Sequence, residues 1–194
     1  MDKKIIAKIY KEFHTPRHII AHMKKVAKVA KSLAVKINNK GNKINVELIE
    51  NAALLHDVVR CVDFASIEEK NFKIKPSKSD LIYWQNLWKK YHKIGHEKAM
   101  AKILKLNGEK KLADLIAKHG FFSVWKLKTL EEKILYYADK RVDRDKVVTL
   151  EVRFEEGKKR NMSPTDDKEF IKKTENKVYE LEREFFKILG EHID

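Results

Sequence analysis

The chain of 194 residues is long enough for one domain with a substantial core and too short for two comfortable ones. Its six glycines and three prolines fall well below the roughly 12% of average usage, which argues against a β-sandwich or barrel with a turn every ten residues or so. One cysteine excludes a disulfide framework and a thiolate-rich zinc site. The formal net charge is +14.

Only seven of the 43 basic residues are Arg, the residue that phosphate and base recognition favour, and the lysines are spread along almost every segment. We therefore interpret the charge as a solvated surface that attracts anionic ligands. No apolar run approaches the ~18 residues that a membrane helix needs. The first residues lack the apolar core of a signal peptide, so we expect a cytoplasmic protein.

Helical patterns follow one another along the chain. A short amphipathic segment is expected over about 2–12, and Thr15 and Pro16 then give an N-cap and a first helical position for a long helix. This helix ends in the polar stretch 38–42. One of its faces carries apolar residues at alternating spacings of four and three, namely Ile19, Met23, Val26, Ala30, Leu33 and Ile37.

The later elements follow from the same periodicity. The segment 61–92 holds several aromatic side chains, and we expect it to be a long connection between core helices. Ser163-Pro164 caps a C-terminal amphipathic helix over about 164–192. Further helices are expected near 46–60, 93–107, 109–119, 130–145 and 147–160. The predicted fold class is all-α.

Six ionisable side chains fall on the inward faces of these helices. His22 follows Ile19 by three residues, for example, and Asp57 follows Ala53 by four. The six are His22, His56, Asp57, His96, His119 and Asp139. A buried carboxylate costs several kcal/mol unless a cation meets it. A single inward histidine is more often a core residue than a ligand, but four inward histidines and two inward aspartates on five helices favour a metal such as Mn, Fe, Co, Ni or Zn.

Three short motifs resemble the HD superfamily of metal-dependent phosphohydrolases. They are the upstream His22, the run Ala53-Leu54-Leu55-His56-Asp57 and the later Tyr137-Ala138-Asp139-Lys140. The stretch 130–154 is similar to an uncharacterised bacterial and archaeal branch. The resemblance covers about 14–160 and implies a helical bundle with about five core helices and a metal at its centre. Because the sequence contains no convincing linker, we expect a single domain over 1–194 with extra terminal helices.

The resemblance also implies a ligand set. His22, His56, Asp57 and Asp139 would bind a first divalent ion. In the two-metal members two further histidines come between the HD pair and the last aspartate, and His96 and His119 match that order. Asp57 would then bridge both ions.

Two departures from the family pattern affect this reading. Val58-Val59 follows the HD pair where many members have Ile-Gly, and a Gly-Tyr-Pro signature is missing. The resemblance therefore gives no support for cyclic-di-GMP as the substrate. It also leaves open a one-ion site in which His96 and His119 bind phosphate.

The expected activity is hydrolysis of a phosphate ester or anhydride of a small, nucleotide-like molecule through a metal-bound hydroxide. Asp57 would orient or deprotonate the water, and Lys140 is the candidate catalytic cation and phosphate clamp. Further candidates for substrate binding are Arg60, Arg144 and His18. Arg144 is expected on the same helix as Lys140, pointing away from it by ~140°.

Two other classes of function stay open. One is an HD-type di-iron oxygenase, which resembles the hydrolases in its ligand set. The other is a non-catalytic basic domain that binds nucleic acid and holds a structural metal; a steep loss of affinity with salt would identify it. We do not favour nucleic acid as the partner, because the lysines are not clustered. The sequence leaves the oligomeric state open.

Overall fold

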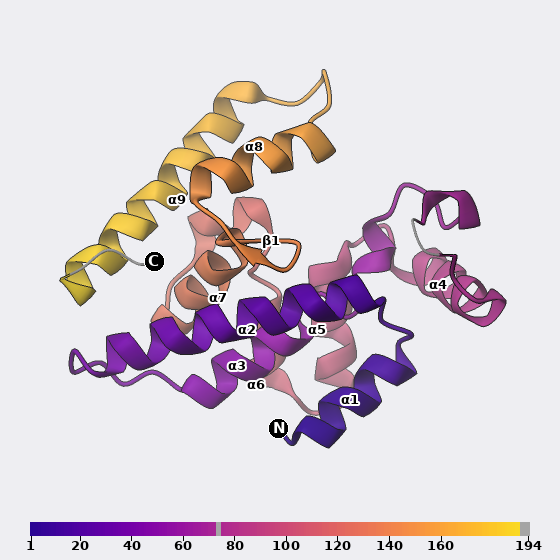
Figure 1. Ribbon diagram of the computed structural model, residues 1–194, viewed down its shortest axis with the longest axis horizontal. Coiled ribbons are helices and arrows are strands. Elements are labelled where there is room, and N and C mark those ends of the chain that lie inside the picture. The colour runs from indigo at the N-terminus through magenta and orange to yellow at the C-terminus, as the bar shows by residue number, and fades with distance from the viewer. Residues whose placement is uncertain (73–74, 191–194) are drawn as a thin grey trace.

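The structure is a computed structural model that describes residues 1–72 and 75–190, and it is almost entirely helical (Figure 1). In chain order its elements are α1 (Lys3–Glu12), α2 (Arg17–Asn38), α3 (Val46–Leu55), the 3-10 turns η1 (Arg60–Asp63) and η2 (Glu69–Asn71), α4 (Lys78–Tyr91), α5 (His96–Leu106), α6 (Lys110–Ile116), η3 (Phe121–Lys126), α7 (Leu130–Lys140), the short strands β1 (Val142–Asp143) and β2 (Lys146–Val147), α8 (Leu150–Asn161) and α9 (Lys168–Leu189). The all-α prediction is confirmed.

The bundle is organised around α2, which runs across the front of the molecule in Figure 1. This helix packs on α3 and α7, α3 packs on α6, and α6 packs on α5. The predicted apolar face of α2 is buried from Met23 to Ile37. These five helices enclose the core, while α8 and α9 cover one side and α4 lies at the opposite edge.

The second predicted helix, 46–60, is too long. The structure ends α3 at Leu55, and a turn and the 3-10 turn η1 follow. The carbonyl of Val58 accepts a hydrogen bond from Thr15 Oγ1 (3.3 Å), and the backbone N–H of Val62 bonds to Val59 instead. Thr15 is therefore no N-cap, and the next helix begins at Arg17.

Other helix ends also differ from the prediction. The helix expected over 93–107 begins at His96, because Gly95 interrupts the chain with φ of 78°. The helix expected over 109–119 ends at Ile116. The C-terminal helix begins after Asp167, whose carboxylate accepts from the backbone N–H of Phe170 (2.9 Å). Residues 191 and 192 of the predicted helix lie outside the described residues.

The helix expected over 130–145 stops at Lys140, and an antiparallel hairpin of β1 and β2 replaces its last turn. Val142 pairs with Val147, and the Arg141 side chain donates to the carbonyl of Val148 (2.8 Å). The helix predicted near 147–160 correspondingly begins at Leu150. The β-branched valines fit the paired strands better than another helical turn.

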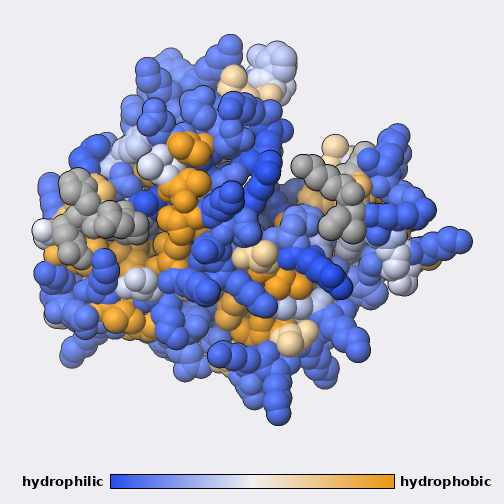
Figure 2. Space-filling model, viewed as in Figure 1, coloured by the Kyte–Doolittle hydropathy of each residue, from blue (hydrophilic) through white to orange (hydrophobic). Residues whose placement is uncertain are grey.

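The surface seen in Figure 2 is mostly hydrophilic, and it is indented between the α8–α9 pair and the part that carries α4. The β1–β2 hairpin and η1 lie on either side of this indentation in Figure 1. In the described part of the chain, every helix is too short or too polar to pass through a lipid bilayer.

Candidate metal centre

The two residues of the HD pair lie in the turn directly after α3. His56 is fully buried and Asp57 is 8% exposed. The ring of His56 turns back on the end of the helix, and its Nδ1 donates to the carbonyl oxygen of Ala53 (2.8 Å). This bond satisfies one carbonyl at the helix end and points Nε2 into the interior.

Asp139, in the last turn of α7, gathers two histidines from other elements. Its Oδ1 lies 3.0 Å from Nε2 of His22 on α2 and 3.5 Å from Nε2 of His56. One ligand atom from each of these three buried residues lies within 4.8 Å of the others. They form the first half of the cluster.

The second half consists of His96, at the start of α5, and His119, just after α6. Their Nε2 atoms are 2.8 Å apart. Asp57 Oδ1 lies 2.9 Å from Nε2 of His96 and 3.4 Å from Nε2 of His119. The other oxygen, Oδ2, lies 3.8 Å from Nε2 of His56. Asp57 therefore presents one oxygen to each half, and all six predicted ligands lie in one cluster.

Hydrogen bonds from Nδ1 to backbone carbonyls fix the rings of three of the histidines. Nδ1 of His22 donates to the carbonyl of Arg144 (2.7 Å), and Nδ1 of His119 donates to the carbonyl of Ile116 (2.6 Å). Together with the bond of His56, these contacts leave the three Nε2 atoms facing inward. Outer hydrogen bonds of this kind orient metal-ligating histidines in proteins.

Two buried atoms at the centre lack a hydrogen-bond partner in the described chain, namely His56 Nε2 and Asp57 Oδ1. Asp57 Oδ1 lies 2.9 Å from His96 Nε2. Buried polar atoms are normally paired, and a cation between these atoms would satisfy both. The donor set of imidazole nitrogens and carboxylate oxygens suits a divalent transition ion.

The charges in the cluster keep its acids ionised. Burial raises the pKa of Asp57, but His56 and Arg60 outweigh burial and hold that pKa well below its usual value. Burial likewise raises the pKa of Asp139, while the Lys140 ammonium and neighbouring histidines pull it well below normal. Both carboxylates are therefore charged, the form that binds a metal.

Comparison with known proteins agrees with this arrangement. A family model described as HD domain matches residues 19–142, the segment that contains all six clustered residues. The chain belongs to the HD domain family. No curated protein and no solved structure matches it. HD domains are typically metal-dependent hydrolases, and the buried histidines and aspartates of this chain are compatible with an HD-type metal site.

The two cations nearest to the centre of this HD domain differ in exposure. The side chain of Lys140 is 8% exposed, and its ammonium donates to Asp139 Oδ2 (2.5 Å) and to the carbonyl of His119 (3.0 Å). Arg60 is 37% exposed, and its Nη1 lies 3.0 Å from His96 Nε2. Lys140 is thus built into the HD cluster, whereas Arg60 faces both the cluster and solvent.

The remaining two predicted substrate-binding residues are Arg144 and His18. The prediction that Arg144 shares the helix of Lys140 is wrong: it lies at the hairpin turn, with φ of 55° and an exposed side chain. Its carbonyl, rather than its guanidinium, contacts the centre through His22. His18 is exposed one turn before His22; partial burial and the charge of His22 lower its pKa.

Asp63 was missed by the sequence reasoning. Its carboxylate accepts from the Nδ1 of His96 (2.5 Å) and from the backbone N–H of the same residue (2.8 Å). No helix is predicted from the sequence in the segment 61–92, so inward and outward positions are not assigned there, although the structure forms α4 over Lys78–Tyr91. The only available signal is its spacing of three from Arg60, which suits a 3-10 turn.

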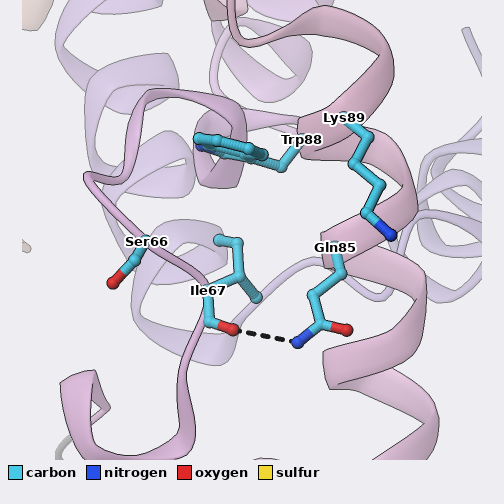
Figure 3. Close-up of a pocket in the computed structure, with 5 residues that line it drawn as sticks. All are labelled: Ser66, Ile67, Gln85, Trp88 and Lys89. Carbon is cyan, nitrogen blue, oxygen red and sulfur yellow. Dashed lines mark hydrogen bonds between the residues drawn. The ribbon is translucent and has the colours of Figure 1, made fainter.

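A cavity of about 330 Å³ lies in the same segment of this HD domain, between residues 66–67 and α4 (Figure 3). The face of Trp88 lies over Ile67. Gln85 Nε2 donates to the Ile67 carbonyl (3.1 Å) at the edge of the cavity. Its lining contains none of the predicted site residues. Trp88 Nε1 donates to the carbonyl of Phe64, next to Asp63 (2.9 Å), which fixes the cavity wall to the end of η1.

Proposed function

We propose that this HD domain is a metal-dependent phosphohydrolase that cleaves a phosphate ester or anhydride of a small, nucleotide-like substrate. The observation that carries the proposal is the placement of Asp57 between two sets of inward imidazole nitrogens, with Asp57 Oδ1 and His56 Nε2 lacking a hydrogen-bond partner in the described chain. This arrangement supports the binding of cations rather than the closure of an ordinary polar core.

The chain offers ligands for two divalent ions. His22, His56 and Asp139 would hold one of them, and His96 and His119 the other, with one oxygen of Asp57 directed to each. Mn, Fe, Co, Ni and Zn all accept this donor set. Ions bound there would act as Lewis acids toward phosphoryl oxygens and would lower the pKa of water to about 7.

The cations of the chain have separate roles in this proposal. Arg60 presents a planar fork of N–H donors that matches two phosphate oxygens, and its partial exposure lets it meet a substrate from solvent. Lys140 uses two of its three ammonium N–H groups on Asp139 and on the His119 carbonyl. It fixes the carboxylate and leaves one N–H for a phosphate oxygen.

The surroundings of the centre favour a small anionic substrate. A net charge of +14 raises the local concentration of anions near the protein. The six candidate ligand residues are each at most 8% exposed, so the site admits a phosphoryl group more readily than a polymer backbone. The non-phosphate part of the substrate would then face the segment 61–92, which borders the centre through η1.

The test is a phosphate-release screen on tag-free protein, with nucleoside mono-, di- and triphosphates and dinucleotides and with Mn, Co, Ni, Fe or Zn. We expect release of phosphate or nucleotide that requires the ion and stops with a chelator. Retained metal with no turnover of any phosphate compound would overturn the proposal. Two bound irons with O₂ uptake would instead favour the oxygenase class.

A further inference from the structure

His96 differs from the other three histidines of the cluster in what holds its ring. The Nδ1 atoms of His22, His56 and His119 all donate to backbone carbonyls. Nδ1 of His96 meets the carboxylate of Asp63 instead. A carboxylate that is hydrogen-bonded to a metal-ligating histidine fixes the orientation of the ring. It also makes the other ring nitrogen more basic, and therefore a stronger ligand for the metal.

The carboxylate of Asp63 acts on the backbone and on the side chain of the same residue. Oδ1 accepts from the backbone N–H of His96 (2.8 Å), and Oδ2 accepts from its Nδ1 (2.5 Å). The first bond caps the N-terminus of α5, where the helix dipole also favours a negative charge. The second sets the direction of the ring, so the start of the helix and its first side chain are fixed together.

The preceding residue makes this approach feasible. Gly95 has φ of 78°, a conformation that other residues rarely adopt. A Cβ atom there would lie 3.1 Å from Glu97 Oε2 and 3.9 Å from Asp63 Oδ1. The chain therefore turns into α5 tightly enough to bring His96 onto η1.

On the far side of the ring, His96 Nε2 lies 2.9 Å from Asp57 and 2.8 Å from His119 Nε2. With Nδ1 bound to Asp63, Nε2 is the ring nitrogen directed at those two residues. Arg60, which is three residues before Asp63, has its Nη1 3.6 Å from Asp63 Oδ2. The carboxylate thus lies behind the ring and opposite the ion position.

We propose that Asp63 is the positioning residue for one of the two ions. The ion held by His96, His119 and Asp57 depends on it, and the ion held by His22, His56 and Asp139 does not. This inference rests on the metal centre of the proposed function. Replacing the carboxylate by an amide separates the two bonds: Oδ1 of an Asn still accepts from the backbone N–H, but its NH₂ group cannot accept from Nδ1–H.

The test compares Asp63→Asn with Asp80→Asn in the full chain. Asp80 is a matched control, because its Oδ1 also meets a histidine Nδ1 (His14, 2.6 Å) and it also lies in the first turn of a helix. Metal-free proteins are titrated with MnCl₂ by calorimetry, and bound Mn is counted by elemental analysis. We expect two ions in wild type and in Asp80→Asn, and about 10- to 100-fold weaker binding of one ion only in Asp63→Asn.

A double variant separates positioning from a general effect on the fold. If Asp63 acts through His96, adding Asp63→Asn to His96→Ala weakens Mn binding no further than His96→Ala alone. Circular dichroism melts of the metal-free variants show whether each is folded. Wild-type affinity for both ions in Asp63→Asn overturns the inference, as do equal weakening of both ions, a further loss in the double variant, or a wild type that binds a single ion.

The outcome is separable from the fate of the proposed activity. Two Mn ions in wild type without any phosphate release would refute the hydrolase and leave the role of Asp63 intact. Metal-dependent hydrolysis by wild type together with unaltered Mn binding in Asp63→Asn would refute the role of Asp63 and leave the hydrolase intact.

Discussion

The two halves of the polar cluster share Asp57 but differ in how the protein neutralises them. In the half formed by His22, His56 and Asp139, the balancing cation is Lys140, which is buried and bonded to Asp139. In the half formed by His96 and His119, the nearby cation is Arg60, which is more than a third exposed. The cation of the first half is enclosed by the protein, whereas the side chain of the second half's cation reaches solvent and is suited to phosphate.

This difference indicates a division of labour. A buried ammonium bonded to a ligand carboxylate serves the integrity of the centre, because breaking such a pair leaves a charge in the interior. A partly exposed guanidinium can rearrange when an anion arrives. We therefore expect changes in the first half to affect stability and changes in the second half to affect metal stoichiometry and turnover.

The largest effect is expected where the halves meet. Asp57→Ala removes the carboxylate that faces both sets of nitrogens, so it should lose both ions and abolish phosphate release while keeping the helical circular dichroism signal. Elemental analysis and the phosphate-release assay measure this. Asp114→Ala, at an exposed ion pair with Lys105, is the control and should behave as wild type. Hydrolysis retained by pure Asp57→Ala would contradict the shared role.

The next effect tests the half that contains Lys140. Lys140→Met leaves the buried carboxylate of Asp139 without its ammonium and should lower the free energy of unfolding of the metal-free protein by about 3–5 kcal/mol. Lys31→Met removes one member of an exposed pair with Glu50 (2.8 Å) and should cost about 0–1 kcal/mol. Urea denaturation gives both values. Equal losses would show that the buried Lys140–Asp139 pair contributes no more to stability than an exposed pair.

The smallest effect tests the backbone contact behind His22. Arg144→Gly keeps the carbonyl and suits the φ of 55°, so Mn content should match wild type and the free energy of unfolding should change by less than about 1 kcal/mol. Arg144→Val places a β-branched residue in that conformation and should weaken the ion of the first half. Calorimetric Mn titration distinguishes the two. Loss of that ion in Arg144→Gly would assign the role to the side chain.

The sequence predicted the all-α fold and the residues of the cluster, because helical periodicity places side chains on a buried face whatever the helix length. His56 and Asp57 illustrate this well. They were expected within a helix and lie in the turn after it, yet the first residues beyond a helix still continue its face. His119, three residues past the end of α6, is a similar case.

Two residues outside the α-helices, Arg144 and Asp63, were not predicted correctly, because helical periodicity does not apply to them. Arg144 was assigned to a helix, although the chain turns into a hairpin after Lys140, and its contribution is a carbonyl that no side-chain pattern reports. Asp63 lies in a 3-10 turn, where the spacing of inward residues is not that of an α-helix. The orientation of the ligands is therefore set by features that become visible only in three dimensions.

The most direct measurement of the central claim is an anomalous difference map from crystals of the tag-free protein loaded with Mn. The account predicts density between Asp57 and the Nε2 atoms of His56 and His22, and a second peak between Asp57 and the Nε2 atoms of His96 and His119. Mn bound only at the surface, with the six side chains hydrogen-bonded to one another or to water, would contradict it.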